Sequence, residues 1–223
     1  MADAGALWLT VKLAGITTVL LFLVGTPLAW WLAMTRSRVR PAVEAVTALP
    51  LVLPPTVLGF YLLLAFNPEA PLGRLWLQAT GDTLTFSFPG LVLASVLYSL
   101  PFMVQPLTTA FAAVGRAPLE AAASLRAGPL DAFVTVAVPL AARGFLTAGV
   151  LTFAHTLGEF GVVLMVGGNI PGETRLISIA IYEHVETLDY AAAHRLSALL
   201  LVASFIVLTL THAVNRRGRV HVA

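Results

Sequence analysis

The sequence contains no cysteine, a single lysine and few charged residues of either sign. The absence of cysteine excludes disulfide bonds, thiolate catalysis and cysteine-ligated metal sites. Only 11% of the 223 residues are charged and 58% are apolar, whereas about a quarter of the residues in an ordinary soluble domain are charged. The formal charge is +2 and the arginines are scattered, so no basic face indicates nucleic-acid binding. A soluble fold this apolar could not cover its own surface.

The single lysine, Lys12, has a further consequence for energy supply. A phosphate-binding P-loop has the pattern Gly-x-x-x-x-Gly-Lys-Ser/Thr, and no such pattern surrounds Lys12. The chain therefore has no Walker-type cradle for ATP. Any ATP-driven work must take its energy from a partner chain.

Apolar residues occur in long uninterrupted blocks. No charged residue occurs in residues 13–34, 45–67 or 83–115. Blocks of about 18 or more such residues are typical of membrane-spanning helices, because a helix of about 20 residues matches a hydrocarbon core about 30 Å thick. Two further spans are predicted at residues 144–166 and 196–214. The stretch 176–182 is too short to cross a bilayer and is predicted to form a short helix at one face.

The distribution of charge predicts how these spans are oriented. With five spans and the N-terminus outside, nine basic residues lie inside and four lie outside, as the positive-inside rule requires. The inner ones are Arg36, Arg38, Arg40, Arg116, Arg126, Arg143, Arg216, Arg217 and Arg219; the outer ones are Lys12, Arg74, Arg175 and Arg195. The chain is therefore predicted to be an all-α integral membrane protein, N-terminus out and C-terminus in, with one membrane domain over residues 1–223.

A long cytoplasmic connection is predicted at residues 116–139. Pro118 and the alanine-rich run after Glu120 predict a short helix, because proline suits the first turn and an acidic residue stabilises the N-terminal end. Gly128 suits the end of this helix, a second short helix follows, and Pro139 is expected to open the fourth span. A connector between spans is usually shorter than these roughly 25 residues. The segment is therefore predicted to present a surface to another protein, with a plain connector as the alternative.

This segment resembles the EAA loop of ABC importer permeases, whose pattern is Glu-Ala-Ala, three residues, Gly, nine residues, Ile, one residue, Leu-Pro. The initial Glu-Ala-Ala and the final Pro are present, but Arg126 occupies the glycine position and a glycine appears two residues later. In this family the loop forms the coupling helix, which docks into a groove on the ATP-binding subunit. The residues that the resemblance assigns to this docking are Glu120, Ala121, Ala122, Arg126, Gly128 and Pro139.

Other segments are similar to molybdate-transporter permeases, and the resemblance covers roughly residues 7–214. They are residues 49–60, 86–91, 98–106, 158–161 and 167–172. The resemblance implies the fold of a type I ABC importer permease, with molybdate as the imported oxyanion and sulfate or tungstate as alternatives. It implies a bacterial or archaeal cytoplasmic (inner) membrane protein that is not itself an enzyme.

The same resemblance implies a set of partners. These are a second copy of the chain in a homodimer, two ATP-binding cassette subunits, and a periplasmic oxyanion-binding protein. The ATP-binding subunits hold ATP and magnesium, so no cofactor is expected in this chain. The loop at residues 169–175 is a candidate docking surface for the binding protein.

Prolines and polar residues inside the spans are candidates for the pathway or its gate. Each proline removes a backbone hydrogen bond, which either kinks a helix for packing or frees carbonyl groups that line a path. Amide and hydroxyl groups offer an anion weak donors, which suit a conduit because a tight site would trap its cargo. The candidates are Pro54, Pro55, Pro101, Gln105, His155, Glu159 and Asn169.

Glu159 is the one acidic residue inside an expected span, and His155 lies four residues earlier on the same helical face. A carboxylate at mid-membrane costs about 2–3 kcal/mol on insertion scales, so Glu159 should face protein or water. Three interpretations remain: a buried hydrogen bond that locks the helix, part of the gate, or a metal or catalytic site. A carboxylate does not attract an oxyanion. An intramembrane enzyme using His155 and Glu159, and a secondary transporter coupled through Glu159, are the remote alternatives to an importer permease.

Overall fold

The computed structural model describes residues 2–216 and contains helices but no strands within that range. Three helices are long and apolar enough to cross a membrane: α1 (Ala2–Met34), α5 (Phe88–Val114) and α12 (Tyr190–Arg216). Two bent pairs of helices also qualify if each pair is counted as one span, which gives three to five candidate spans. The predicted all-helical membrane fold is confirmed, and the predicted five spans are the upper limit.

The second expected span, residues 45–67, is broken in the middle. It consists of α2 (Arg40–Val52) and α3 (Pro55–Phe66), whose axes are bent by 112°. Leu53 is extended because a proline follows it, and neither Pro54 nor Pro55 has an amide hydrogen that could continue α2. The chain then turns through a further short helix, α4 (Pro71–Thr80). The prolines therefore produce a full break at this point.

The fourth expected span, residues 144–166, is also interrupted, so the prediction of one continuous helix there is wrong. Helix α9 (Ala142–Leu157) is followed by Gly158 at its C-cap, and α10 (Gly161–Gly167) begins three residues after that glycine. Phe160, between them, has φ −133° and ψ −65°, which is not a helical conformation. Side chains of α5 hold the interruption in place, as described below.

The beginning of the fourth span also differs from expectation. The second half of the predicted connection at residues 116–139 consists of α7 (Pro129–Ala132), the π-helical turn η1 (Phe133–Ala137) and α8 (Val138–Leu140), which ends one residue beyond it. This segment is bent by 72° from α9. Pro139 lies inside α8 and does not open the span, which begins at Ala142. By contrast, the short helix expected at 176–182 is confirmed as α11 (Ile177–Glu186).

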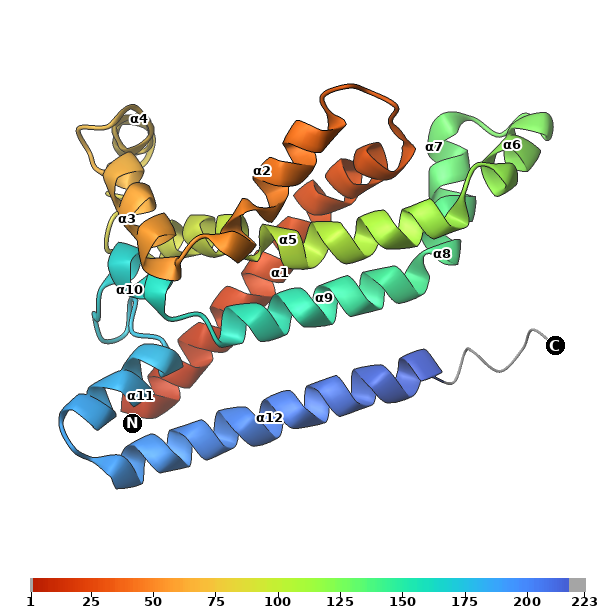
Figure 1. The fold of residues 1–223 in the computed structure, drawn as a ribbon. Coiled ribbons are helices and arrows are strands. Elements are labelled where there is room, and N and C mark those ends of the chain that lie inside the picture. Colours follow the sequence, from red (N-terminus) through yellow and green to blue (C-terminus); the bar gives the residue numbers. More distant parts are fainter. Residues whose placement is uncertain (1, 217–223) are drawn as a thin grey trace.

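Helices α1, α5 and α9 form the centre of the molecule (Figure 1). Leu21 of α1, Phe111 of α5 and Ala148 of α9 are fully buried in one cluster there. Trp30 packs edge-on against Phe111, with ring centroids 5.1 Å apart. At one end of this bundle, α3 and α10 pack against each other and against α5.

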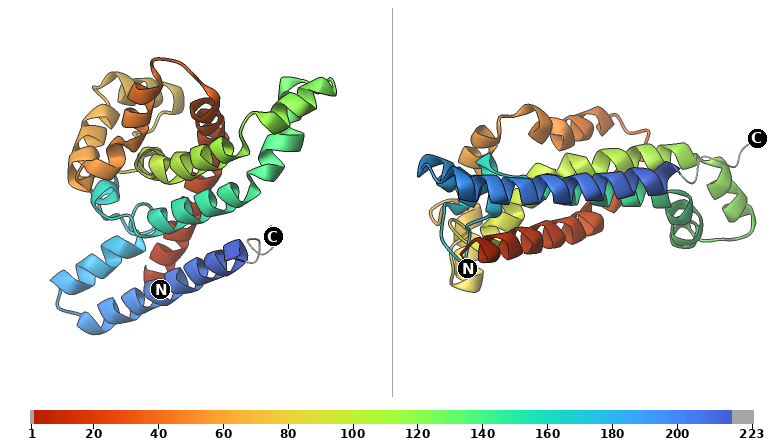
Figure 2. Two further views of the ribbon diagram at one scale, coloured as in Figure 1. Left: turned by 45° about the vertical axis from the view of Figure 1, so that its right-hand side comes forward. Right: turned by 90° about the horizontal axis from the view of Figure 1, so that it is seen from below.

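Helix α12 runs along one side of the central bundle, next to α9 (Figure 1 and the left view of Figure 2). Only 11% of its apolar window is buried within the chain, and Leu201 and Phe205 are 70% and 69% exposed. A long apolar helix with this exposure must be covered by lipid or by another protein chain.

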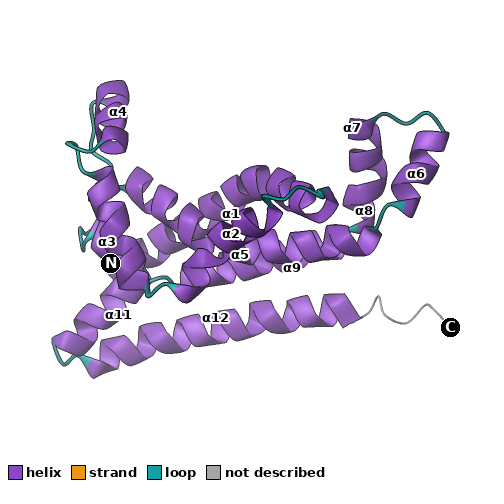
Figure 3. Ribbon diagram, turned by 45° about the horizontal axis from the view of Figure 1, so that its top comes forward, coloured by secondary structure: helices purple, strands orange, loops and turns teal. Residues whose placement is uncertain are grey.

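The connections between helices divide between two ends of the molecule (Figures 1 and 3). One end holds the α1–α2 connection and the α6–α8 region, where α6 is Ala117–Ser124, and there the Nη2 atom of Arg116 donates to the Met34 carbonyl at 3.1 Å. The other end holds the beginning of α1 together with α4 and α11. There, Nε2 of His184 in α11 lies 3.3 Å from Oδ1 of Asp3 in α1. The predicted inner and outer loops are thus separated in space. The orientation of the two ends stays a prediction from charge, and Arg217 and Arg219, which contributed to it, lie outside the described residues.

Candidate functional site

The two helix breaks meet at one place in the fold. A Cβ atom added to Gly161, at the start of α10, would lie 2.8 Å from the Cβ of Pro55, at the start of α3. One turn further along α3, a Cβ atom on Gly59 would lie 2.8 Å from the Cβ of Met165 in α10. Glycine at both positions therefore allows α3 and α10 to approach closely.

A pocket of ≈ 580 Å³ lies beside this meeting point. Its walls come from α3, α5, the end of α9, the break and α10. The lining residues are Pro55, Thr56, Tyr98, Ala154, His155, Gly158, Glu159, Phe160, Gly161, Leu164 and Met165. Three of the sequence-predicted pathway residues, Pro55, His155 and Glu159, are thus brought together in one pocket.

The Glu159 carboxylate is completely buried and bonded to α5. Ser95 Oγ donates to Oε2 at 2.5 Å, and Ser99 Oγ donates to Oε1 at 2.7 Å. On the other side, Ser178 of α11 donates to the Glu159 carbonyl oxygen at 2.5 Å. These bonds satisfy the carboxylate as burial requires. They also tie the α9–α10 break to two other helices, which agrees with the interpretation of Glu159 as part of a structural lock.

His155 lies between this buried network and the pocket. Its Nδ1 atom is 2.9 Å from Ser99 Oγ, and its imidazole ring is 18% exposed. The ring stacks on Phe102, with centroids 3.9 Å apart and an interplanar angle of 23°, and it also contacts Tyr98 at 4.7 Å. Packing and hydrogen bonding therefore fix the plane of the imidazole, with one nitrogen turned toward Ser99.

The donor set at this site does not match a metal centre. Among residues 2–216, no group of three or more His, Asp or Glu side chains is arranged to hold a metal ion. His155 and Glu159 contact each other only loosely, with Nδ1 and Oε1 3.6 Å apart, and Ser99 lies between them. The cluster has the properties of a buried hydrogen-bond network with one edge open to a pocket.

Three sequence-predicted pathway residues lie away from this pocket. Pro101 is buried within α5. Gln105 is exposed in a separate pocket of ≈ 340 Å³, toward α2, that also includes Glu44. Asn169 lies after α10, where its Nδ2 donates to Glu183 Oε2 at 2.9 Å. Pro54, the remaining one, forms the α2–α3 break and immediately precedes the pocket residue Pro55.

Sequence reasoning missed the partners that α5 contributes. Ser95 and Ser99 are four residues apart, as are His155 and Glu159, so each pair lies along one face of its own helix. Equal spacing of polar residues in two apolar spans was the signal that could have connected them. Tyr98 was also missed, because an aromatic residue is ordinary in a membrane helix.

The predicted coupling loop is exposed at the far end of the molecule from this pocket (Figure 1). Glu120 and Ala121 of α6 are exposed. Leu125 and Leu130 are 84% and 75% exposed, although leucine is among the residues most often buried in folded proteins. The loop therefore offers a surface of small and apolar side chains, with the exposed carboxylates Glu120 and Asp131, that the chain itself does not cover.

Helix α6 ends earlier than predicted, and the residue that ends it is Arg126. The Ala127 amide donates to the Ala122 carbonyl at 3.1 Å, and the Arg126 amide donates to the Ala123 carbonyl at 2.9 Å. This pair of bonds defines a Schellman motif. The residue at its C′ position, here Arg126, adopts the left-handed conformation that favours glycine. Arg126 has φ +66°, so it adopts the backbone that the glycine of the EAA pattern would supply. Gly128 has φ −68° and does not take over this role.

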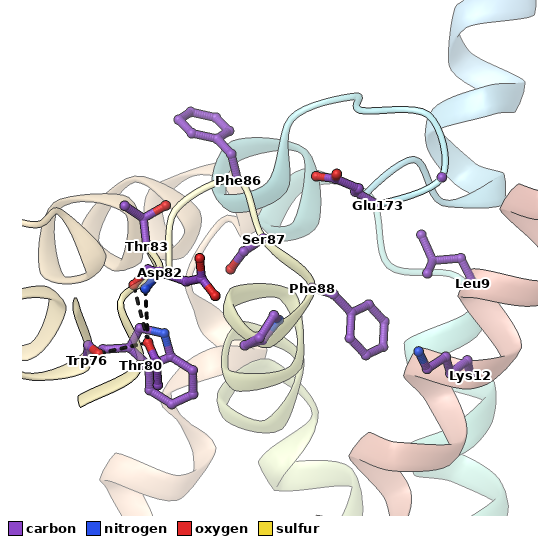
Figure 4. A pocket seen from close by; sticks show the side chains of 12 residues that line it. Leu9, Lys12, Trp76, Thr80, Asp82, Thr83, Phe86, Ser87, Phe88 and Glu173 are labelled. Atoms are coloured by element: carbon purple, nitrogen blue, oxygen red, sulfur yellow. Dashed lines mark hydrogen bonds between the residues drawn. The ribbon is translucent and has the colours of Figure 1, made fainter. Parts of the chain in front are cut away.

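A further hollow of ≈ 630 Å³ lies at the other end of the molecule, near the N-terminus (Figure 4). Lys12 of α1 lines one side, with its ammonium 4.5 Å from the centre of the Phe88 ring. Asp82 and Glu173 also line it (Figure 4). Two carboxylates and one ammonium give this hollow a net negative charge, so it is poorly suited to hold an oxyanion.

Comparison with known proteins places these features in context. Residues 25–220 match the model of a family described as "Binding-protein-dependent transport system inner membrane component". A molybdenum transport system permease protein, ModB, of Azotobacter vinelandii is 58% identical over 214 residues, which cover 96% of this chain and 95% of the relative. The protein of the same name from Mycobacterium tuberculosis is 41% identical, covering 91% and 76%. A probable sulfate transport system permease protein, cysT, of Helicosporidium sp. subsp. Simulium jonesii is 30% identical, covering 93% and 76%.

Solved structures share the fold at low sequence identity. A structure of the MetNI methionine ABC transporter in an inward-facing conformation superposes with a TM-score of 0.72 at 16% identity, covering 95% of this chain and 94% of that chain. A bacterial alginate ABC transporter in complex with an alginate-bound periplasmic protein superposes with a TM-score of 0.76 at 17% identity, covering 96% and 78%. The arrangement of helices is therefore one that ABC importers use.

Proposed function

This chain belongs to the family of binding-protein-dependent transport system inner membrane components, and we propose that it is the membrane-spanning permease subunit of an ATP-driven importer of molybdate. The observation that carries the proposal is the 58% identity, over 96% of the chain, to a molybdenum transport system permease protein. The permease is not itself an enzyme. Hydrolysis of ATP belongs to a separate subunit, in agreement with the missing P-loop around Lys12.

The α6–α8 region is the proposed contact with the ATP-binding subunits, which hold ATP and magnesium. A protruding apolar surface lies at one end of the bundle. It consists of the exposed side chains of Leu125 and Leu130 and the Schellman turn between them. Glu120 stands on the exposed face of α6. When two ATP-binding subunits close on ATP, they would move the α6–α8 region toward the centre of the complex. Helices α5 and α9, which flank this region, would tilt with it as rigid bodies.

The pathway is proposed to pass the pocket where the two helix breaks meet. Where a helix is broken, some backbone N–H and C=O groups have no partner within that helix. Such groups are tolerated at membrane depth where they line a water-filled path. Residues 2–216 provide at most five spans, which are too few to enclose a path. We therefore propose a homodimer with the pathway on its twofold axis. A periplasmic oxyanion-binding protein would deliver the cargo at the end that holds Asn169 and α11. The assembly would lie in the bacterial cytoplasmic membrane.

Sulfate and tungstate are the alternatives for the cargo. Similarity to a probable sulfate permease extends over 93% of the chain at 30% identity, well below the value for the molybdenum relative. Tetrahedral dianions differ mainly in size, and the pocket that separates them belongs to the binding protein. Molybdate is therefore proposed on the higher identity.

The experiment that tests this function is uptake of labelled molybdate by the native host, with and without a deletion of this chain. Loss of molybdate uptake on deletion, with sulfate uptake retained and restoration by the plasmid-borne chain, is the expected result. Loss of sulfate uptake with retained molybdate uptake would instead assign the chain to sulfate. Retention of both would overturn the assignment as an oxyanion permease.

The proposed coupling surface has its own test. The tagged chain is purified in mild detergent, and an ATP-binding cassette subunit is expected to copurify in a one-to-one ratio. Glu120→Arg reverses a charge on the exposed face of α6 and is expected to reduce the recovered partner, while yield and thermal stability of the chain stay unchanged. Equal recovery of the partner with Glu120→Arg and with wild type would exclude this face as the contact.

A further inference from the structure

We propose that His155 donates the hydrogen bond that receives the oxyanion in the pathway, and that it does so only when the Glu159–Ser99–His155 cluster carries one additional proton. The inference rests on the proposed function, because it assigns a chemistry to the pocket beside the α9–α10 break. Transport would then depend on proton uptake by this cluster as well as on ATP. The numbers of hydrogen atoms and lone pairs that these three side chains can share determine this dependence.

Ser99 is the link between the other two residues. Its Oγ lies 2.7 Å from Glu159 Oε1, 2.9 Å from His155 Nδ1 and 2.9 Å from Thr156 Oγ1. A serine hydroxyl has one hydrogen to donate and two lone pairs to accept with. Only one of the three neighbours can therefore receive a hydrogen from Ser99. Thr156 does not decide which one, because its own hydroxyl donates to the Thr152 carbonyl at 3.0 Å.

Without the additional proton, Glu159 is a carboxylate and His155 is neutral. A carboxylate only accepts hydrogen bonds, so the Ser99 hydrogen goes to Oε1 of Glu159. Nδ1 of His155 must then carry the imidazole hydrogen and donate it to Ser99, because two lone pairs facing each other at 2.9 Å would repel. A neutral imidazole has only one N–H. Its other nitrogen, Nε2, is then a bare acceptor.

One added proton reverses the character of Nε2 when it resides on His155 or on Oε1 of Glu159, the carboxylate oxygen that faces Ser99. If it is on His155, both ring nitrogens are donors. If it is on Glu159, the carboxylic acid donates to Ser99, Ser99 donates to Nδ1, and the imidazole hydrogen moves to Nε2. In both arrangements every hydrogen bond of the cluster is kept and Nε2 carries a hydrogen.

The surroundings of His155 make this change relevant to an anion. Among residues 2–216, no group forms a hydrogen bond with Nε2 of His155. This nitrogen is also not fully buried, and the imidazole lines the pocket. A tetrahedral oxyanion is an acceptor at every oxygen, so it is repelled by a bare Nε2 and bound by Nε2–H. No arginine or lysine is among the residues that line this pocket. Stacking on Phe102 holds the ring in a fixed plane, so no reorientation is needed.

Few titratable groups face His155. From α5, Tyr98 contacts the imidazole ring at 4.7 Å between centroids. Glu159 is the one carboxylate, and its side chain is completely buried. α3 and α10 contribute Pro55, Thr56, Gly161, Leu164 and Met165 to the pocket, none of which titrates. The proton that matters is therefore shared by Glu159 and His155.

The test uses the complete importer in proteoliposomes, with its ATP-binding subunits and binding protein, from about pH 6 to about pH 8.5. Uptake of labelled molybdate is compared between wild type and His155→Arg, which keeps a permanent donor at the same place. Because both proteins use the same partners, the ratio of their rates at each pH cancels the pH dependence of those partners. The ATP hydrolysis rate of each sample confirms that the variant is assembled.

The expected result is a wild-type to His155→Arg ratio that is constant at low pH and falls by about tenfold per pH unit on the alkaline side. The sign follows from the mechanism, since the proton is required and is lost as pH rises. Ser99→Ala removes the acceptor that holds the hydrogen on Nδ1. A neutral His155 can then place its hydrogen on Nε2, so the ratio of the Ser99→Ala rate to the His155→Arg rate should stay constant as pH rises.

Three other outcomes overturn the inference in distinguishable ways. A ratio that does not change with pH, while both proteins import molybdate, excludes the proton-linked donor and leaves the permease function intact. A ratio of Ser99→Ala to His155→Arg rates that declines with pH as the wild-type ratio does excludes Ser99 as the link. Absence of molybdate uptake by the wild-type complex at every pH, with ATP hydrolysis intact, overturns the proposed function and this inference with it.

Discussion

Gly161 lies so close to Pro55 that a Cβ atom on Gly161 would be 2.8 Å from the proline Cβ. These two residues begin α10 and α3, so their contact joins the break in one expected span to the break in another. A proline ring cannot move aside as a flexible side chain can. The shape of the pocket beside them therefore depends on the missing side chain at Gly161.

Gly161→Ala is expected to destabilise the protein by about 1–3 kcal/mol, the usual cost of overpacking, and to reduce oxyanion uptake. The midpoint of thermal unfolding in detergent, followed by tryptophan fluorescence, measures the first effect. Gly158→Ala is the matched control, because a Cβ there would meet its nearest atoms, two carbonyl oxygens, at 3.7 and 3.9 Å. Equal effects of the two substitutions would show that the Pro55 contact does not determine the result.

The long helices could be predicted from the sequence, but most of the places where expected spans are interrupted could not. Uncharged blocks predicted α1 and α5, because the length and apolarity of a span are local properties. The break at Pro54 was indicated, since proline cannot continue a helix. The break after Gly158 was not, because glycine is tolerated in membrane helices. What fixes that break is a set of hydrogen bonds to Glu159 from residues about 60 positions away.

The candidate site was predicted in the same uneven way. His155 and Glu159 were recognisable as polar residues in an apolar span, and both line the pocket. Their serine partners were not recognisable, because a hydroxyl in a membrane helix usually bonds to a carbonyl of its own helix. Arg126 was noted as a departure from the glycine of the EAA pattern. Its left-handed conformation depends on where α6 ends, which composition does not specify.

Ser95→Ala is expected to destabilise the protein, because it removes the 2.5 Å hydrogen bond to a completely buried carboxylate oxygen. Hydrogen bonds to charged groups contribute about 1.5–3 kcal/mol. Thr108→Ala is the control on the same helix, since that hydroxyl donates only to the Val104 carbonyl of α5 at 2.7 Å. Thermal unfolding midpoints of the purified complexes compare the two. If Thr108→Ala lowers the midpoint as much as Ser95→Ala, the bond to Glu159 has no special role.

Arg126→Gly is expected to make the coupling loop more rigid. A non-glycine residue in the left-handed region costs about 1–2 kcal/mol, and part of that gain is offset by the greater entropy of glycine in the unfolded chain. Hydrogen exchange of the Ala127 amide, which bonds to the Ala122 carbonyl at 3.1 Å, should slow by a few-fold. Gly128→Ala should leave this exchange unchanged, because Gly128 has φ −68° and no atom near its added Cβ. Faster exchange in Arg126→Gly would mean that the arginine side chain stabilises the turn.

The close contact between α5 and α9 near the proposed coupling loop is where we expect motion of that loop to reach the spans. Near the beginning of α9, a Cβ atom on Gly144 would overlap the Cβ of Ala110 in α5, while its other neighbours lie at 3.7 Å. Gly144→Ala should therefore push α5 and α9 apart, lower the thermal midpoint and reduce transport-coupled ATP hydrolysis. Because the overlap involves two Cβ atoms, Ala110→Gly in the same chain should restore both properties, although glycine in a helix costs about 1 kcal/mol. The double variant identifies the cause of the defect. If its thermal midpoint and its ATP hydrolysis are no higher than those of Gly144→Ala alone, the defect comes from the changed backbone at residue 144. The close approach of α5 and α9 would then not be required for coupling.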